Sequence, residues 1–163
     1  MIVVMMGVSG SGKTTVGTLL AKQMGATFAD ADDYHPQANK QKMAAGIPLT
    51  DEDRQPWLET LNRLLVQWYE QKQSGVLACS ALKQKYRETL ETNLPADTLR
   101  FVWLDGSPEL IAGRLKTRQH SFMNPNLLAS QIATLEPPSD ALRIDNEGAP
   151  EAVAAEILNK LKS

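Results

Sequence analysis

Cysteine is scarce in this sequence, since Cys79 is the only one among 163 residues. A single thiol excludes an intramolecular disulfide and a metal cluster built from cysteines, and it fits a reducing compartment. Long apolar runs are lacking too: the N-terminal run from Ile2 to Met6 meets glycine after five residues. A membrane span needs about 18 apolar residues. We therefore expect a soluble cytoplasmic protein with neither a signal peptide nor a membrane-spanning helix.

A strong excess of charge of either sign is also lacking. The 17 basic and 19 acidic residues give a formal net charge of -2 at pH 7, so no global basic field would attract the chain to nucleic acid or to an acidic membrane. Sequence repeats and linkers rich in Pro, Gly or Ser are missing as well. The chain is predicted to form a single domain spanning residues 1–163, with a monomer and a homodimer both left open.

The sequence does contain a phosphate-binding motif near its start. Residues 7–14, GVSGSGKT, match G-x-x-x-x-G-K-[ST], with an apolar strand pattern before them and a helical pattern after them. Glycines let backbone N–H groups turn toward a phosphate, and the following helix directs its positive N-terminal end to the same anion. Lys13 is predicted to bind the β- and γ-phosphates of a nucleoside triphosphate, and the Thr14 hydroxyl to hold Mg²⁺. The predicted nucleotide-binding residues are Gly7, Val8, Ser9, Gly10, Ser11, Gly12, Lys13, Thr14 and Thr15.

Strand patterns alternate with helical patterns along the chain. This alternation predicts an α/β protein in which helices cover both faces of a mainly parallel, five-stranded sheet. Acidic residues close the second predicted strand, at the edge of the sheet where a phosphate loop would also lie. The predicted strands are 2–6, 26–29, 76–79, 99–104 and 141–144, and the predicted helices include 12–24, 39–45, 81–94 and 127–135.

Three local features bear on the predicted helices. The run Thr50-Asp51-Glu52-Asp53 is typical of a capped helix start, although Pro56 is expected to interrupt the early turns of that helix. Ser80 is expected to cap the helix over 81–94, which would carry Lys83, Lys85 and Arg87. From about residue 118 the periodicity is lost, which predicts a mobile lid over about 118–131.

A phosphate loop alone is compatible with kinases, hydrolysing motors and guanine-nucleotide switches. A switch needs Asn-Lys-x-Asp after a late strand, and this sequence has none; its single D-x-x-G, at 145–148, comes too late in the chain. A motor normally has an acidic residue at the end of its third strand, where this chain has Cys79-Ser80. The sequence therefore favours phosphoryl transfer to an acceptor over dedicated hydrolysis.

Transfer to a hydroxyl requires a carboxylate near the γ-phosphate and cations that hold the spread negative charge. We expect Asp32 to orient or accept the hydroxyl proton, the alternative being that Asp30, Asp32 and Asp33 merely cap the local backbone. Arg114 and Arg118, one helical turn apart, are the predicted catalytic cations, unless they are surface arginines of an amphipathic helix.

Four stretches resemble the gluconokinases, which are small ATP-dependent sugar-acid kinases. They are GVSGSGKTT, FADADDYHPQANKQKMAAGIPLTDEDRQPWL, CSALKQKYR and RLKTRQHSFMNPNLLASQIATLEPP. The second stretch is long and particular to this group, and the resemblance extends from Met6 to about Pro138. It implies phosphorylation of D-gluconate at its 6-hydroxyl by MgATP, on a P-loop kinase fold with a mobile lid, similar to shikimate and nucleoside monophosphate kinases.

The resemblance also implies roles for single residues. It places Lys13 and Asp32 at the reaction centre, with Arg114 and Arg118 in the lid, and it makes about 32–58 the acceptor-binding segment. His35, Arg54 and Lys83 line the acceptor side by the same resemblance. Two positions depart from the family pattern: Ala31 replaces a glycine, and Ser121 separates His120 from Phe122, which leaves the role of His120 open.

The residues themselves leave several alternatives. A sugar-acid carboxylate calls for a cation, which Arg54 with Lys83 or Arg87 could supply; equally, Arg54 could pair within its helix with Asp51 or Glu52. His35, before Pro36, could be a turn residue with a satisfied imidazole. For the whole protein, the alternatives are a kinase of another carboxylated acceptor, such as shikimate, and a nucleotide-dependent binding module without transfer chemistry.

Overall fold

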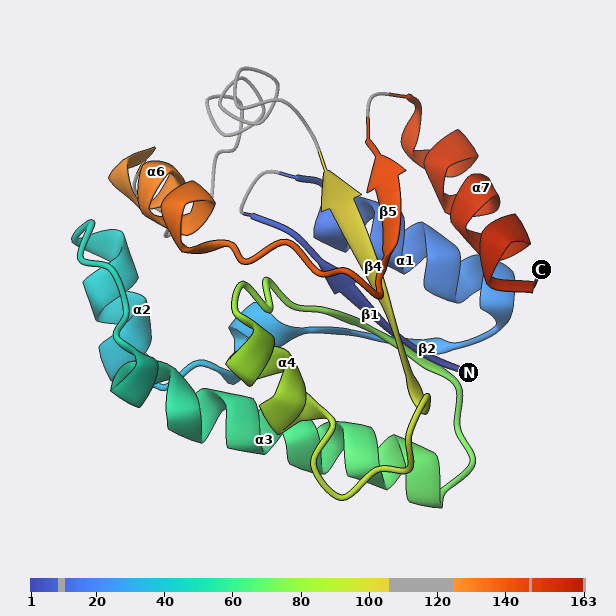
Figure 1. The fold of residues 1–163 in the computed structure, drawn as a ribbon, viewed down its shortest axis with the longest axis horizontal. Helices are drawn as coiled ribbons and strands as arrows, with labels where there is room; N and C mark the ends of the chain where they lie inside the picture. Colours follow the sequence, from blue (N-terminus) through green and yellow to red (C-terminus); the bar gives the residue numbers. More distant parts are fainter. Residues whose placement is uncertain (9–10, 106–124, 147, 163) are drawn as a thin grey trace.

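A computed structural model of the protein describes residues 1–8, 11–105, 125–146 and 148–162. Its centre is a five-stranded sheet in the order β2-β3-β1-β4-β5, and every pair of neighbouring strands is parallel (Figure 1). The expected parallel α/β architecture is thereby confirmed, and each predicted strand is found within one residue of its expected ends. The strands are β1 (Ile2–Met6), β2 (Thr27–Asp30), β3 (Gly75–Ala78), β4 (Leu99–Asp105) and β5 (Leu142–Asp145).

Both faces of the sheet are covered, which explains why β1 and β3 are apolar throughout rather than alternating. On one face α1 (Lys13–Met24) packs beside α7 (Pro150–Lys162), over a core that includes Val3 and Met5 of β1. On the other face α3 (Asp51–Glu70) and α4 (Gln84–Leu90) cover a second core that includes Val4 and Met6. Alternate residues of one buried strand thus serve two cores, which gives three layers.

Strand β1 is the point at which the chain changes from one half of the sheet to the other. The chain places β3 on one side of β1 and β4 on the other, and a crevice opens beyond the carboxyl ends of the strands at such a switch point. The segments that leave β1, β2 and β3 therefore meet at the end of the sheet where the carboxyl ends of the strands lie. These segments contain the phosphate loop, the acids after β2, and the residues before α4.

Helix α3 corrects one expectation. Pro56 lies inside a continuous helix of 20 residues and does not interrupt it. Proline removes the one backbone hydrogen bond that an N–H at position 56 would make to the carbonyl four residues earlier, close to the start of the helix. A capping box between Thr50 and Asp53, with burial of Trp57 and Leu61, holds the helix together on both sides of the proline.

The region after β3 gives a second correction. The expected helix from 81 to 94 begins only at Gln84 and ends at Leu90, with Lys83 rather than Ser80 at its N-cap. Ala81 has a left-handed backbone with φ 45, which is incompatible with a helix starting there, and Asn93 at φ 63 ends the helical path. Lys83 therefore precedes the helix instead of lying on its surface.

Three further elements complete the described chain. A short 3-10 helix, η1 (Ala31–Tyr34), was not expected; α2 (Gln37–Ala44) and α6 (Pro125–Thr134) match predicted helices. Most of the predicted lid lies outside the described residues. Within the described ranges, no helix is long and apolar enough to cross a membrane.

Candidate active site

The phosphate loop leaves β1 and ends in α1, as the motif predicts. Gly7 has φ 149, and a Cβ atom there would come within 2.8 Å of the Leu104 carbonyl and of the Ser11 hydroxyl. Gly12 is left-handed, with φ 95, and forms the N-cap of α1 without a side-chain cap. Glycine is required at both positions, so the loop follows a path close to β4 and presents the N-terminus of α1. Ser9 and Gly10 lie outside the described residues.

The side chain of Lys13 turns back over the loop. Its ammonium group donates to the carbonyl oxygens of Gly7, at 2.9 Å, and Val8, at 3.0 Å. These bonds hold a cation beside the backbone N–H groups of the loop. The arrangement can bind the oxygens of a phosphate chain from two sides.

Asn146 fastens the loop from the far side of the sheet and was not predicted. It follows β5, is only 3% exposed, and donates its side-chain amide to the Ser11 carbonyl. Its backbone N–H donates to the Asp105 carbonyl at 2.9 Å, which ties it to the end of β4. The one available signal was a polar residue directly after the last strand, at the edge of the sheet where the loop lies.

Asp30 and Thr14 connect the acids after β2 to the phosphate loop. The Thr14 hydroxyl donates to Asp30 Oδ2 at 2.8 Å, and Asp30 Oδ1 accepts from the backbone N–H of Asp32 at 3.0 Å. Asp30 therefore caps η1, as the local-capping alternative proposed for this group of acids. A hydroxyl and a carboxylate side by side are hard oxygen donors of the kind that Mg²⁺ binds.

Asp32 faces a buried histidine. Its Oδ1 atom lies 4.0 Å from Nε2 of His35, and the side chain of Asp32 is 56% exposed whereas that of His35 is 4% exposed. The imidazole stacks on Trp57 with ring centroids 4.1 Å apart, and the Trp57 indole donates to the Ala31 carbonyl at 2.7 Å. Trp57 thus links α3 to the residue directly before Asp32.

His35 is neutral at physiological pH in this environment. Burial lowers its pKa from the usual 6.5 to about 4, and the positive charges of Arg54 and Lys40 act in the same direction. One ring nitrogen of His35 is satisfied, as the alternative of a turn residue expects, because the Asn39 side chain is hydrogen-bonded to Nδ1. Nε2 faces the carboxylate of Asp32.

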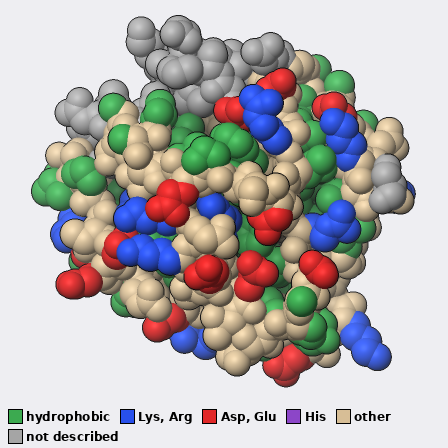
Figure 2. All heavy atoms as spheres, viewed as in Figure 1, with side chains coloured by type: hydrophobic (Ala, Val, Ile, Leu, Met, Phe, Trp, Pro, Cys, Tyr) green, Lys and Arg blue, Asp and Glu red, His purple; other side chains and the backbone are tan. Residues whose placement is uncertain are grey.

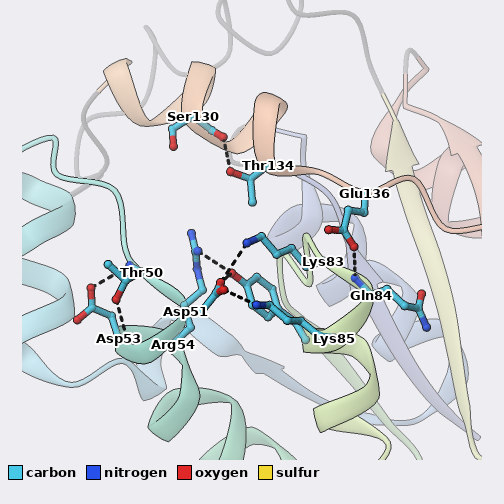
Figure 3. A network of polar contacts seen from close by, with 11 residues as sticks. Thr50, Asp51, Asp53, Arg54, Lys83, Gln84, Lys85, Ser130, Thr134 and Glu136 are labelled. Atoms are coloured by element: carbon cyan, nitrogen blue, oxygen red, sulfur yellow. Dashed lines mark hydrogen bonds and ion pairs between the residues drawn. The ribbon is translucent and has the colours of Figure 1, made fainter.

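Lys83 contacts a carboxylate that α3 supplies, and Arg54 is linked to the same carboxylate through a hydroxyl of α4 (Figure 3). Arg54 donates to the Tyr86 hydroxyl at 2.8 Å, and that hydroxyl donates to Asp51 Oδ1 at 2.5 Å. Lys83 donates to the same oxygen at 3.1 Å, and Lys85 contacts Oδ2. These donors hold the pKa of Asp51 far below its usual range, with the hydrogen bond from Lys85 as the largest cause. The structure thus assembles cationic and hydroxyl donors that match a carboxylate.

Arg87 is excluded from this cluster. The sequence offers Arg87 as a possible cation for a sugar-acid carboxylate, but its side chain is buried, with 3% exposure. It donates to the carbonyls of Ala81 and Glu136, at 2.7 Å and 2.9 Å. Arg87 therefore connects α4 to the segment that follows α6, and burial lowers its pKa. Arg114, Arg118 and His120 lie outside the described residues.

The end of β3 offers no acid or nucleophile. Cys79 is buried, and burial raises its pKa to about 12, so the thiol stays protonated. The Ser80 carbonyl accepts a hydrogen bond from the N–H of Gly7 at 3.4 Å, which joins this strand end to the phosphate loop. On the face of the molecule that is turned to the viewer in Figure 2, acidic and basic side chains are intermingled rather than separated by sign.

Comparisons with known proteins show which proteins this chain is similar to in sequence and in fold. A family model described as Shikimate kinase matches residues 9–162. A gluconokinase from Gluconobacter oxydans is 44% identical over 98% of this chain and 90% of its own length. Among solved structures, a sugar kinase from Janibacter sp. superposes with a TM-score of 0.91 at 42% identity, covering 99% of this chain and 94% of that one. A gluconokinase from Sinorhizobium meliloti superposes with a TM-score of 0.80 at 38% identity, covering 98% and 94%.

Proposed function

Because this chain belongs to the gluconokinase family, we propose that it transfers the γ-phosphoryl group of ATP to the 6-hydroxyl of D-gluconate, giving 6-phospho-D-gluconate and ADP. The observation that carries this proposal is the juxtaposition of two sites. A phosphate loop with Lys13 and Thr14 at its end is joined through Asp30 to Asp32, and a cluster suited to a carboxylate lies on the adjoining helices α3 and α4. Gluconate carries both groups that these sites require, a hydroxyl and a carboxylate.

The donor side consists of residues 7–15, with the N–H groups of the loop and the ammonium of Lys13 on the β- and γ-phosphates. Mg²⁺ fits this end of the site because Thr14 and Asp30 bring two oxygen donors together. When bound, the ion neutralises charge on the phosphates. The remaining steps belong to side chains of the protein.

On the acceptor side, Asp32 is the general base. An oxygen atom can lie within about 2.8 Å of both His35 Nε2 and Asp32 Oδ1, because these two atoms are 4.0 Å apart. A hydroxyl in that place donates its proton to Asp32. As its oxygen bonds to the γ-phosphorus, the bond from that phosphorus to the bridging oxygen of ADP breaks and the proton passes to the carboxylate.

The carboxylate of gluconate binds the donors that now surround Asp51, with Arg54 and Lys83 as its principal partners. The hydrogen bonds that Lys83 and Tyr86 donate to Asp51 support this part of the proposal. Arg114 and Arg118 hold the charge on the transferred phosphoryl group, and a lid over about 118–131 excludes water while residues 32–58 bind the acceptor. In this proposal the chain acts as one kinase domain from residue 1 to 163.

A coupled assay of ADP release over a panel of sugar acids and shikimate tests the proposal. We expect MgATP-dependent turnover on D-gluconate and none on shikimate. Turnover on shikimate alone would instead establish the kinase of another carboxylated acceptor. ATP binding without turnover on any member of the panel would establish a binding module. The names of the relatives at about 40% identity favour gluconate.

A further inference from the structure

Asn39 lies behind the histidine of the proposed site and has no part in the function described so far. It belongs to α2, is 4% exposed, and makes two hydrogen bonds with its side-chain nitrogen. One goes to the backbone carbonyl of Asp53, at 2.9 Å, and the other joins Nδ1 of His35, at 3.2 Å. A buried amide placed between a fixed carbonyl and a titratable ring constrains the chemistry of that ring.

The direction of both bonds follows from the carbonyl. A carbonyl oxygen only accepts, so the Asn39 group that faces Asp53 is the NH₂ group, which carries two hydrogens. The second hydrogen points at Nδ1 of His35, which must therefore accept. A neutral imidazole carries one proton. That proton is consequently on Nε2, the nitrogen that faces Asp32.

The surroundings keep this arrangement in place. Asp53, whose carbonyl orients Asn39, belongs to the capping box of α3 and pairs with Lys42 of α2 at 2.8 Å. On its flat side the imidazole is held by the Trp57 ring, inclined by only 12°. Turning the ring over would break the bond from Asn39. The position of Nε2–H is therefore determined by α2 and α3 together.

We propose that Asn39 is a positioning residue, which fixes His35 in the Nε2–H form so that the imidazole donates to the acceptor hydroxyl between itself and Asp32. This inference rests on the proposed function. A hydroxyl oxygen that accepts from Nε2–H has its own proton left for Asp32, and its remaining lone pair is available to attack phosphorus. With the proton on Nδ1 instead, Nε2 and Asp32 would both act as acceptors and compete for the same hydroxyl proton.

The direct test is ¹⁵N NMR of the imidazole in the ligand-free protein at pH 7. The chain has two histidines, so a His120→Gln variant assigns the His35 signals. We expect a proton on Nε2 and an unprotonated Nδ1. A wild-type ring protonated on Nδ1, or on both nitrogens, would overturn the inference whether or not any Asn39 variant folds.

Asn39→Asp supplies the functional arm of the test. The carboxylate keeps the shape of the amide but only accepts, so it should draw the proton to Nδ1 or protonate the ring. We expect kcat with gluconate to fall by about ten- to hundred-fold, with the KM for ATP unchanged. Asn62→Asp is the matched control, because Asn62 is also buried and donates to two backbone carbonyls, of Leu90 and Thr92, at 2.8 Å each.

The outcomes separate the positioning role of Asn39 from the proposed function of the protein. An altered His35 protonation pattern with kcat no lower than in Asn62→Asp would refute the positioning role. An unaltered pattern in Asn39→Asp would refute the proposed cause. If the wild-type ring shows the expected pattern but gluconate is not phosphorylated, the proposed function fails while the assignment of the proton stands, because the NMR measurement needs no substrate.

Discussion

Two acidic residues at the end of β2 have different environments although one residue separates them. Asp30 has a hydrogen bond on each carboxylate oxygen, from Thr14 and from the backbone of Asp32. Asp32 is more than half exposed and faces His35. A carboxylate engaged at both oxygens is suited to hold the site together, whereas an accessible one can take a proton. The choice of Asp32 as the base therefore has a structural reason beyond its position in the sequence.

Replacing Asp32 by Asn should lower turnover far more than it weakens ATP binding. General-base assistance is typically worth about 10²–10⁴-fold in rate, and the amide cannot accept a proton. The measurement is kcat from ADP release, together with the Kd for ATP from calorimetry. Asp33→Asn is the control, since Asp33 is a neighbouring exposed acid of η1, and a variant of Asp32 with unchanged kcat would refute the role.

His35 should make the protein less stable in mild acid. Its folded pKa of about 4 lies below the usual 6.5, so between these values the unfolded chain binds more protons and stability rises with pH. His35→Gln removes this dependence: relative to the variant, the wild type should lose up to about 2 kcal/mol between pH 6.5 and pH 5. Asp51 and Asp53 add their dependence below this window, because their lowered pKa values lie beneath 3.8.

Urea denaturation of both proteins at pH 5, 6 and 7 provides the measurement. The comparison uses only how the free energy of unfolding changes with pH in each protein. Any constant loss of stability from removing the stacked ring therefore does not affect it. If the free energy of unfolding changes equally with pH in wild type and variant, the imidazole is not held neutral by the fold.

At the scale of elements, α3 organises the proposed acceptor side. Its first turns carry Asp51 and Arg54, its next turn carries Trp57, and its start is fixed by the capping box of Thr50 and Asp53. Asp53 also pairs with Lys42, so the same turn connects α2 to α3. One helix terminus therefore sets the positions of Asp51 and Arg54 in the proposed carboxylate-binding cluster, of the ring that supports His35, and of the carbonyl that orients Asn39.

Thr50→Ala should destabilise the protein by about 1 kcal/mol, because it removes the acceptor for the backbone N–H of Asp53. We also expect a higher KM for gluconate with a nearly unchanged KM for ATP, since α3 bears acceptor-side residues only. Urea denaturation and steady-state kinetics provide the two measurements.

Thr60→Ala serves as the control on the same helix, because Thr60 donates to the Pro56 carbonyl inside the helix and caps nothing. Thr60→Ala should leave the free energy of unfolding nearly unchanged or slightly raised, since alanine favours helix interiors. Equal losses in the two variants would contradict a specific role for the cap.

At the scale of the whole molecule, the donor site depends on contacts between distant parts of the sequence. Asn146 reaches Ser11 across 135 positions, and Gly7 contacts both the end of β3 and the end of β4. A ligand in this loop therefore engages the centre of the sheet. Its binding should stabilise the entire fold and not only a local segment.

MgATP should raise the stability of the wild type by about 2.7 kcal/mol at a concentration of 100 Kd. Lys13→Ala should lose most of this gain at the same concentration, because it removes the ammonium that we propose binds the phosphates, while the ligand-free protein stays folded. Thermal unfolding with and without MgATP measures the effect. Lys22→Ala, in the last turn of the same helix, is the control, and an undiminished gain in Lys13→Ala would contradict the assignment.

The strands, most of the helices and the phosphate loop were predictable because their signals are local. An apolar run such as Ile2–Met6 or a pattern such as GVSGSGKT contains within itself the residues that fix its conformation. The missed features depend on distant partners. Arg87 gave no local signal of its role, since its partner Glu136 is remote in sequence. The only signal of Asn146 was its position directly after the last strand, because its partner Ser11 is also remote. The start of α4 was misjudged because the left-handed backbone of Ala81 has no sequence pattern.

The sequence by itself determined the class of protein, the parallel sheet and the phosphate-binding loop, because periodicity and a fixed motif encode them. Its resemblance to the gluconokinases also indicated the reaction. Only the tertiary structure decided which groups meet: Thr14 with Asp30, Asp32 with His35, and Arg54, Lys83 and Tyr86 around Asp51. Those meetings follow from the packing of α2, α3 and α4 against the ends of the strands, and packing depends on the whole chain at once.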